Sequence, residues 1–92
     1  MTAGEALERA HHAGKTGLFQ VSIHVRRDHM KPPGLGGRGV QFGDIRHALK
    51  SCTTASLQDN GRWRMEGGTD LDGDVLTPVC AIEDEVFVVT LF

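Results

Sequence analysis

The sequence predicts a single α+β domain, residues 1–92, in which N-terminal helices pack on a four- or five-stranded, mainly antiparallel sheet. Apolar residues recur at helical spacing near residues 2–14 and 43–51, whereas they alternate with polar residues in several other segments. Turn signals at Asn60-Gly61 and at Glu83-Asp84-Glu85 divide the C-terminal part into hairpins. A chain of 92 residues has room for one hydrophobic core and none for a second catalytic domain.

The N-terminal half is expected to contain a helix, a strand and an exposed loop. Thr2 to Glu5 has the spacing of a capping box, and an apolar stripe follows until Gly14, the expected stop. Apolar and polar residues alternate from Leu18 to Val25, which predicts a strand with His24 on its polar face. Lys31 to Gly37 contains two prolines and three glycines, a composition typical of a flexible loop.

The C-terminal half is expected to add a second helix and two hairpins. Gly43 to Ser51 carries apolar residues on one helical face and basic residues largely off it. Apolar and charged residues alternate after Asn60-Gly61, which indicates a first hairpin. Val75 to Ile82 and Val86 to Phe92 are rich in β-branched residues and indicate a second hairpin. Helices on one face of such a sheet leave the opposite face or an edge open.

Charge is distributed unevenly along the chain. The total of 10 Lys+Arg against 12 Asp+Glu excludes a uniformly basic protein that coats nucleic acid. Residues 20–50 nevertheless hold six basic and two acidic side chains, and seven acidic and no basic side chains follow Arg64. An anionic partner would therefore meet the first half, unless the two halves neutralise each other within the fold.

The N-terminus and the cysteines indicate a cytoplasmic protein. Met1 to Lys15 contains no apolar segment of the kind found in signal peptides or membrane anchors, so we expect no membrane contact. Cys52 and Cys80 lie far apart without the spacing of a zinc site, which favours two isolated buried thiols over zinc or a disulfide.

Two short motifs resemble ligand-binding loops without their context. Gly34 to Gly39 matches GxGxxG, but two prolines stand where a dinucleotide site requires a strand, which favours a loop. Asp70 to Asp74 lacks the glycine and glutamate positions of a calcium-binding loop, which favours a turn. We expect no metal ion and no cofactor.

The densest chemical cluster contains His24, Arg26, Arg27 and His29. Histidine can act as an acid or a base near neutral pH, and arginine binds phosphate oxygens. RNA cleavage without a metal requires a base for the ribose 2′-hydroxyl, an acid for the departing 5′-oxygen and cations for the phosphate. The residues are suited to that chemistry, although composition alone also allows a structural histidine in a solvated basic face.

Ser22-x-His24, followed by Arg38 to Leu49, resembles a small bacterial domain family of unknown function with the patterns Thr/Ser-x-His-Ala, Arg-Gly-Ile-Ser and Asp-Ile-x-x-Ala-Leu. Trp63 to Gly67, Asp72-Gly73 and Val88-Val89-Thr90 also look like its strand region, so the resemblance covers Phe19 to Phe92.

That family is similar to the RelE-like toxins of the barnase, EndoU, colicin and RelE fold group, which are mostly metal-independent ribonucleases. The resemblance implies a RelE-like fold in which His24, Arg38 and Thr90 line a cleft. The chain departs from the pattern at Val25 and in Lys31 to Gly37, which lengthens the connection to Arg38.

Two functional hypotheses follow. The first is a toxin-like, metal-independent endoribonuclease that cleaves RNA by 2′-hydroxyl attack and is restrained by an antitoxin or another protein partner. Its catalytic residues would be His24, Arg38 and Thr90, and its RNA-binding residues would be Arg26, Arg27, Lys31, Arg46 and Lys50. The second is a non-catalytic RNA- or protein-binding module with a structural His24, which binds through its basic helix face or an open sheet edge. Strand pairing across Val86 to Phe92 would also allow a dimer.

Overall fold

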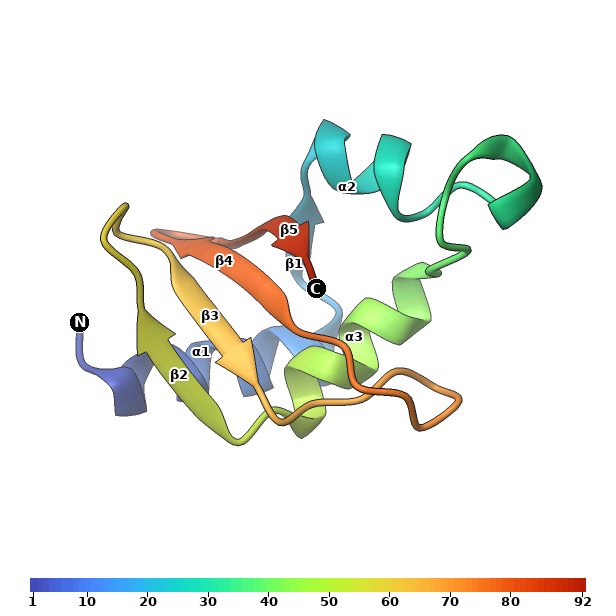
Figure 1. The fold of residues 1–92 in the computed structure, drawn as a ribbon. Helices are drawn as coiled ribbons and strands as arrows, with labels where there is room; N and C mark the ends of the chain where they lie inside the picture. Colours follow the sequence, from blue (N-terminus) through green and yellow to red (C-terminus); the bar gives the residue numbers. More distant parts are fainter.

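The computed structural model describes residues 1–92 as three α-helices and a short 3₁₀ helix with a five-stranded sheet (Figure 1). The elements in chain order are α1 (Ala3–Thr16), β1 (Phe19–Val21), α2 (Ile23–Asp28), η1 (Pro33–Leu35), α3 (Phe42–Ser51), β2 (Thr54–Leu57), β3 (Trp63–Glu66), β4 (Pro78–Ile82) and β5 (Val86–Leu91). The strand order is β1-β5-β4-β3-β2, with β1 parallel to β5 and every other pair antiparallel. The predicted α+β class is confirmed.

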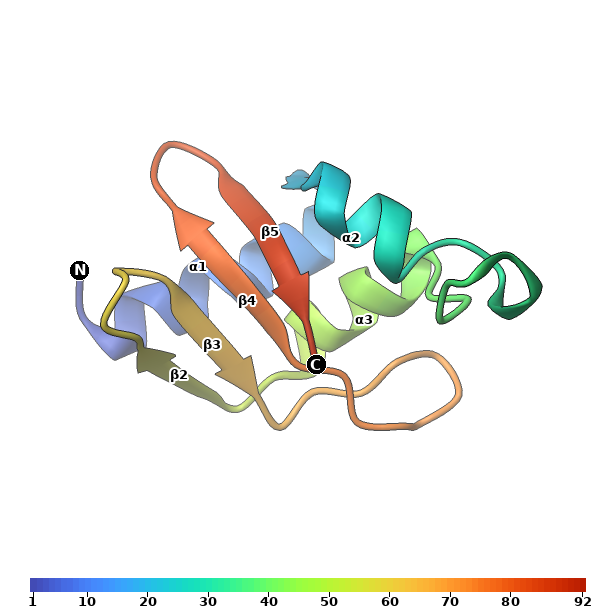
Figure 2. The ribbon, with the colours of Figure 1, turned by 45° about the horizontal axis from the view of Figure 1, so that its top comes forward.

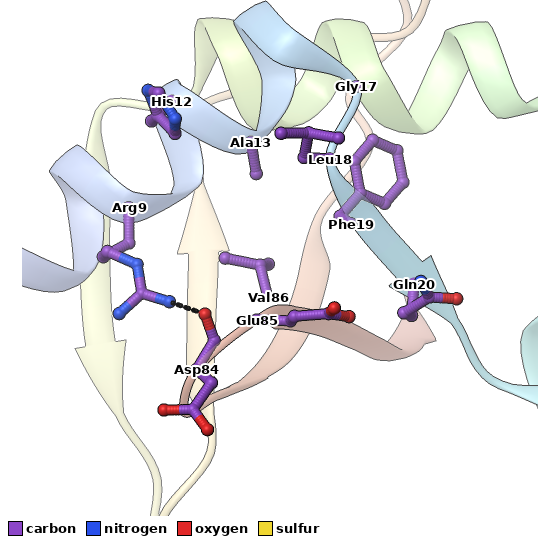
Figure 3. Close-up of a pocket in the computed structure, with 10 residues that line it drawn as sticks. All are labelled: Arg9, His12, Ala13, Gly17, Leu18, Phe19, Gln20, Asp84, Glu85 and Val86. Atoms are coloured by element: carbon purple, nitrogen blue, oxygen red, sulfur yellow. Dashed lines mark hydrogen bonds between the residues drawn. The ribbon is translucent and has the colours of Figure 1, made fainter.

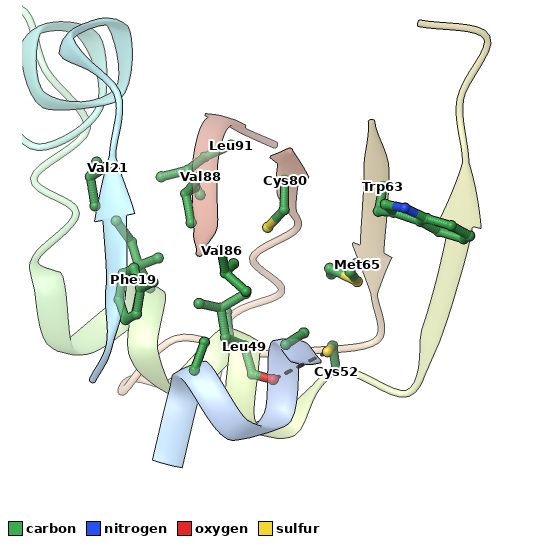
Figure 4. Close-up of a cluster of buried hydrophobic side chains, with 14 of the residues drawn as sticks. Phe19, Val21, Leu49, Cys52, Trp63, Met65, Cys80, Val86, Val88 and Leu91 are labelled. Carbon is green, nitrogen blue, oxygen red and sulfur yellow. Dashed lines mark hydrogen bonds between the residues drawn. The ribbon is translucent and has the colours of Figure 1, made fainter. Parts of the chain in front are cut away.

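The hydrophobic core lies between the sheet and the two longer helices, α1 and α3 (Figures 1 and 2). The helices contribute small and branched side chains to this core. The strands contribute side chains that point toward the helices (Figure 4). Its fully buried members include Ala6, Ala10, Ile45, Leu49, Met65, Cys80 and Val88. The short helix α2 lies beside β5 instead of joining the α1–α3 layer.

The first helix continues past Gly14 and ends at Thr16, with Gly17 as its left-handed cap at φ 75°. Gly14 is buried where α1 crosses α3, and a Cβ there would lie 2.5 Å from the backbone nitrogen of Lys50. The predicted stop at Gly14 is therefore wrong, because this glycine permits close packing of two helices instead of ending one. The N-terminal capping box of Thr2 and Glu5 is present as predicted.

The first strand is shorter than predicted. It ends at Val21, and Ser22 begins helix α2 by accepting a hydrogen bond from the backbone N–H of Val25 at 3.1 Å. Val25 is buried, as the alternation implied, but Ile23 is 77% exposed. A strand continuing through Val25 is therefore wrong, because the serine N-cap competes successfully with the extended conformation.

The two C-terminal hairpins, β2–β3 and β4–β5, are confirmed. Strand β5 lies inside the sheet between β1 and β4, so it has no free edge for the predicted pairing with a second copy across Val86 to Phe92. The edges of the sheet are β1 and β2. None of the helices has the length and apolar character needed to cross a membrane.

Both cysteines are free and buried, as predicted. Burial raises the pKa of the Cys52 thiol to about 11 and that of the Cys80 thiol to about 12. Both side chains therefore act as small apolar members of the core.

Candidate active site

Helix α2 places His24 beside a carboxylate. His24 Nδ1 lies 2.8 Å from Asp28 Oδ2, one helical turn further along, and both side chains are about half exposed. The predicted strand ends at Val25, and if it continued to Asp28 the two residues would be separated by roughly 13 Å, whereas residues four apart on a helix are neighbours. The unexpected helix thus creates a His–Asp pair that the strand would not have formed.

The last strand brings Thr90 to the other nitrogen of the same imidazole. Thr90 Oγ1 lies 3.4 Å from His24 Nε2. Two hydrogen bonds from Ser22 to β5 hold the start of α2 there: its N–H donates to the Val88 carbonyl at 2.9 Å, and its hydroxyl donates to the Val89 carbonyl at 3.0 Å. Ser22 therefore both caps α2 and ties it to β5.

A bulge in β5 determines which way Thr90 points. Cys80 pairs with Val88 and Val79 pairs with Thr90, so Val89 is left without a partner on β4. Strict alternation would place Thr90 on the core face with Val88. The extra residue reverses the alternation, so that Leu91 enters the core and Thr90 turns away from it.

The connection after α2 folds back on the end of that helix. The backbone N–H groups of Arg38 and Val40 both donate to the His29 carbonyl, at 3.2 and 2.9 Å, and Gly39 N–H donates to the Lys31 carbonyl at 2.8 Å. Gly39 has φ 70°, a conformation that favours glycine. The lengthened segment thus forms a closed loop that returns Arg38 to α2, while its flexibility stays a prediction.

Arg38 reaches the second histidine of the cluster. Its Nη1 lies 3.1 Å from His29 Nδ1 and 3.5 Å from the Leu91 carbonyl. The rings of His29 and His24 meet edge to face with centroids 5.4 Å apart. Together, the side chains of His24, Asp28, His29, Arg38 and Thr90 form one continuous group, which we call the histidine cluster.

The two histidines have different electrostatic surroundings. Partial burial, followed by the charges of Arg38 and His24, lowers the pKa of His29 below its usual 6.5. Because a guanidinium can only donate, Nδ1 of His29 accepts the bond from Arg38 and carries no proton. His24 instead contacts the Asp28 carboxylate through Nδ1 at 2.8 Å. The cluster therefore contains an imidazole with a lowered pKa next to one that contacts a carboxylate.

The predicted basic residues separate into two groups. Arg26, Arg27 and Lys31 are exposed on or just after α2, and Arg27 Nε lies 3.6 Å from Asp28 Oδ1. Arg46 lies on α3 and donates to the carbonyls of Gly14 and Lys15 at 2.8 and 2.7 Å, where it caps the C-terminus of α1. Lys50 belongs to the same helix, so neither residue joins the histidine cluster.

A separate cavity of about 360 Å³ opens between α1, β1 and the β4–β5 turn (Figure 3). Arg9 spans it and donates to the carbonyls of Glu83 and Asp84 at 2.7 and 3.0 Å. Its other polar lining includes His12, Gln20 and Glu85. The cavity shares no residue with the histidine cluster, and its arginine is occupied by the turn.

No three His, Cys, Asp or Glu side chains are grouped in a way that could hold a metal ion.

Sequence reasoning named His24, Arg38 and Thr90, and the structure brings these three together. It missed Asp28 as the partner of His24. The separation of four residues was the available signal, but the strand assignment concealed it because only a helix makes that separation a contact.

No protein-family model, no curated protein and no solved structure matches this chain. The RelE-like relationship therefore stays a prediction.

Proposed function

We propose that the protein is a metal-independent endoribonuclease of the toxin type, with the histidine cluster as its active site. The observation that carries the proposal is the contact of two imidazoles with one another, with an arginine beside one and a carboxylate beside the other. These are the groups that phosphodiester transesterification requires: a base, an acid and a cation for the phosphate.

In the proposed reaction His29 is the base, because its lowered pKa keeps it neutral at physiological pH. Arg38 occupies His29 Nδ1 in the free protein and is exposed, so a phosphate group would draw the guanidinium away and free the nitrogen. His24 is the acid, and Asp28 orients its ring through Nδ1. Thr90 holds the other nitrogen, Nε2, which faces the substrate.

The bond changes balance without a further reactant. His29 takes the proton of a ribose 2′-hydroxyl, whose oxygen forms a bond to the adjacent phosphorus. The bond from phosphorus to the 5′-oxygen breaks, and His24 gives its proton to that oxygen. The products are a 2′,3′-cyclic phosphate and a 5′-hydroxyl. Arg38 neutralises the charge that develops on the phosphate oxygens, and Arg26, Arg27 and Lys31 attract the polyanion.

The direct test is incubation of the purified protein with single-stranded RNA in excess EDTA, followed by analysis of the new ends. We expect 2′,3′-cyclic phosphate ends and a loss of roughly 100- to 10,000-fold in cleavage for His24→Ala and for His29→Ala. His12→Ala is the matched control, because His12 is an exposed histidine outside the cluster and its loss should leave cleavage unchanged. RNA with 2′-deoxy sugars should not be cleaved at all.

Two results would overturn the proposal. One is wild-type protein that does not cleave RNA at high concentration although circular dichroism shows it folded. The other is cleavage that His24→Ala leaves as high as His12→Ala does, which would indicate a contaminating nuclease. The first result would leave a binding module in which His24 is structural.

A further inference from the structure

The sheet face turned away from α1 and α3 carries an exposed aromatic ring next to an arginine. Trp63 and Met65 on β3 point into the core, so Arg64 between them points to the opposite face. Its Cζ lies 4.9 Å from the centroid of the Phe92 ring, which follows the buried Leu91 and therefore also points outward. We call these two side chains the Arg64–Phe92 pair.

Phe92 is exposed although its backbone is firmly held. The side chain is 57% exposed, whereas its N–H and carbonyl bond to the carbonyl and N–H of Thr77, both at 2.9 Å. The ring is therefore attached to a fixed point of the sheet while more than half of the residue stays open to solvent. Such a ring offers a stacking surface that loses little conformational freedom when a ligand covers it.

The pair is continuous with the histidine cluster. Thr90 pairs with Val79 on β4, and Val79 pairs with Arg64 on β3, so Thr90 and Arg64 lie in one row on either side of the buried Val79. Phe92 lies two residues beyond Thr90, roughly 7 Å along the chain. A polynucleotide with its reacting phosphate at His24 and Thr90 would therefore have a neighbouring base within reach of Phe92.

We propose that the Arg64–Phe92 pair is the base-stacking platform for single-stranded RNA next to the phosphate that is cleaved, an inference that rests on the proposed ribonuclease function. Bases stack on exposed aromatic rings of sheet surfaces, and a guanidinium contributes both cation–π attraction and charge. Only unpaired bases present a free face to such a platform. The substrate class is accordingly single-stranded RNA, and duplex RNA is excluded from this site.

Charge explains why Phe92 and not Phe87 is the platform. Phe87 is 40% exposed and also faces away from the core, but it follows the acidic turn of Glu83, Asp84 and Glu85. A phosphate backbone is repelled there and attracted at the other end of β5, where Arg38 contacts the Leu91 carbonyl and Arg64 contacts Phe92. Glu66 lies 3.7 Å from Arg64 and offsets part of that attraction.

The test measures binding of fluorescent 2′-O-methyl RNA, which retains bases and phosphates but lacks the attacking hydroxyl. We expect Phe92→Leu to raise Kd by roughly tenfold or more, and Phe92→Trp to leave it equal or lower it, because a ring is kept. Phe87→Leu is the matched control on the same strand and should change Kd less than twofold. Glu66→Gln should lower Kd, since it removes a carboxylate from the path of the phosphates.

The outcomes separate this inference from the ribonuclease proposal. Wild-type cleavage together with an unchanged Kd for Phe92→Leu would overturn the platform and leave the ribonuclease intact. Absent cleavage together with weaker binding by Phe92→Leu would overturn the enzyme, and with it the position of the platform beside a cleaved phosphate, and would leave the pair as an RNA-binding surface. Equal affinity for duplex and single-stranded RNA would contradict the platform. So would self-association that Phe92→Leu abolishes in sedimentation experiments, because the face would then be occupied by a second copy.

Discussion

Replacing Ser22 by alanine should test whether α2 positions the histidine cluster. The Ser22 hydroxyl accepts from Val25 N–H at 3.1 Å and donates to the Val89 carbonyl at 3.0 Å. Loss of an N-cap costs about 1 kcal/mol, and loss of a second, partly buried hydrogen bond costs about 1 kcal/mol more. We therefore expect Ser22→Ala to lower the free energy of unfolding by about 2 kcal/mol and Tm by roughly 10 °C.

The same change should reduce RNA cleavage even where the variant is fully folded. Helix α2 has only six residues, and it places His24 and Asp28 one turn apart. Without its cap the helix frays, which misplaces the acid with respect to Thr90 and His29. The conservative variant Ser22→Thr keeps the hydroxyl and should restore most of the stability and cleavage.

Thr2→Ala provides the control for this experiment. It removes the N-cap of α1, which contributes no residue to the histidine cluster, so it should cost about 1 kcal/mol and leave cleavage unchanged. Urea unfolding followed by the fluorescence of the buried Trp63 measures stability, and cleavage is assayed well below the lower Tm. Two results would refute the role given to Ser22. One is cleavage by Ser22→Ala at the wild-type rate, and the other is a loss of stability no greater than that of a surface substitution.

Two further predictions concern charge and packing. His29 has a lowered pKa, so its contribution to stability is complete above the unfolded value of 6.5 and is lost as pH falls from there through the folded pKa. His29→Gln should flatten the pH dependence of the urea midpoint between about pH 5 and about pH 7.5, and an unchanged slope would contradict this. Gly14→Ala should cost about 1–3 kcal/mol, because the added Cβ would lie 2.5 Å from Lys50 N. Gly4→Ala, whose Cβ would have no neighbour closer than 3.9 Å, should be neutral or stabilising by thermal denaturation, and equal losses for both variants would contradict the packing argument.

The parts of the fold that could be predicted from the sequence depend on local signals. The capping box of Thr2 and Glu5, the apolar stripe of α3 and the Asn60-Gly61 turn each act within a few residues, and all three are present in the structure. The parts that were mispredicted involve competition between local and long-range effects. Gly14 would be a reasonable stop in an isolated helix, but contact with α3 makes a buried glycine favourable inside it.

Residues 22–28 show why the strand assignment failed. Phe19, Val21 and Val25 are all buried, so the apolar pattern fits a strand at these positions as well as it fits a strand followed by a helix. The deciding residue is Ser22, whose hydroxyl bonds to α2 and to β5 at once. Its partner Val89 is 67 residues away in sequence, so the residues near Ser22 do not predict this hydrogen bond.

Most residues of the candidate site, with the exception of Asp28, could be predicted from the sequence, but their arrangement could not. His24, Arg38 and Thr90 meet because of a helix, a loop closed on the His29 carbonyl, and a bulge at Val89. Each of these three features differs from what the simplest sequence pattern implies. The pattern implies a strand in place of the helix, a lengthened connection in place of the closed loop, and strict alternation in place of the bulge. If only the bulge were absent, Thr90 would point into the core and His24 Nε2 would lose its partner. The geometry of the cluster is therefore a property of the tertiary fold, and the His–Asp, His–His and His–Arg contacts are the features that give the ribonuclease proposal its physical basis.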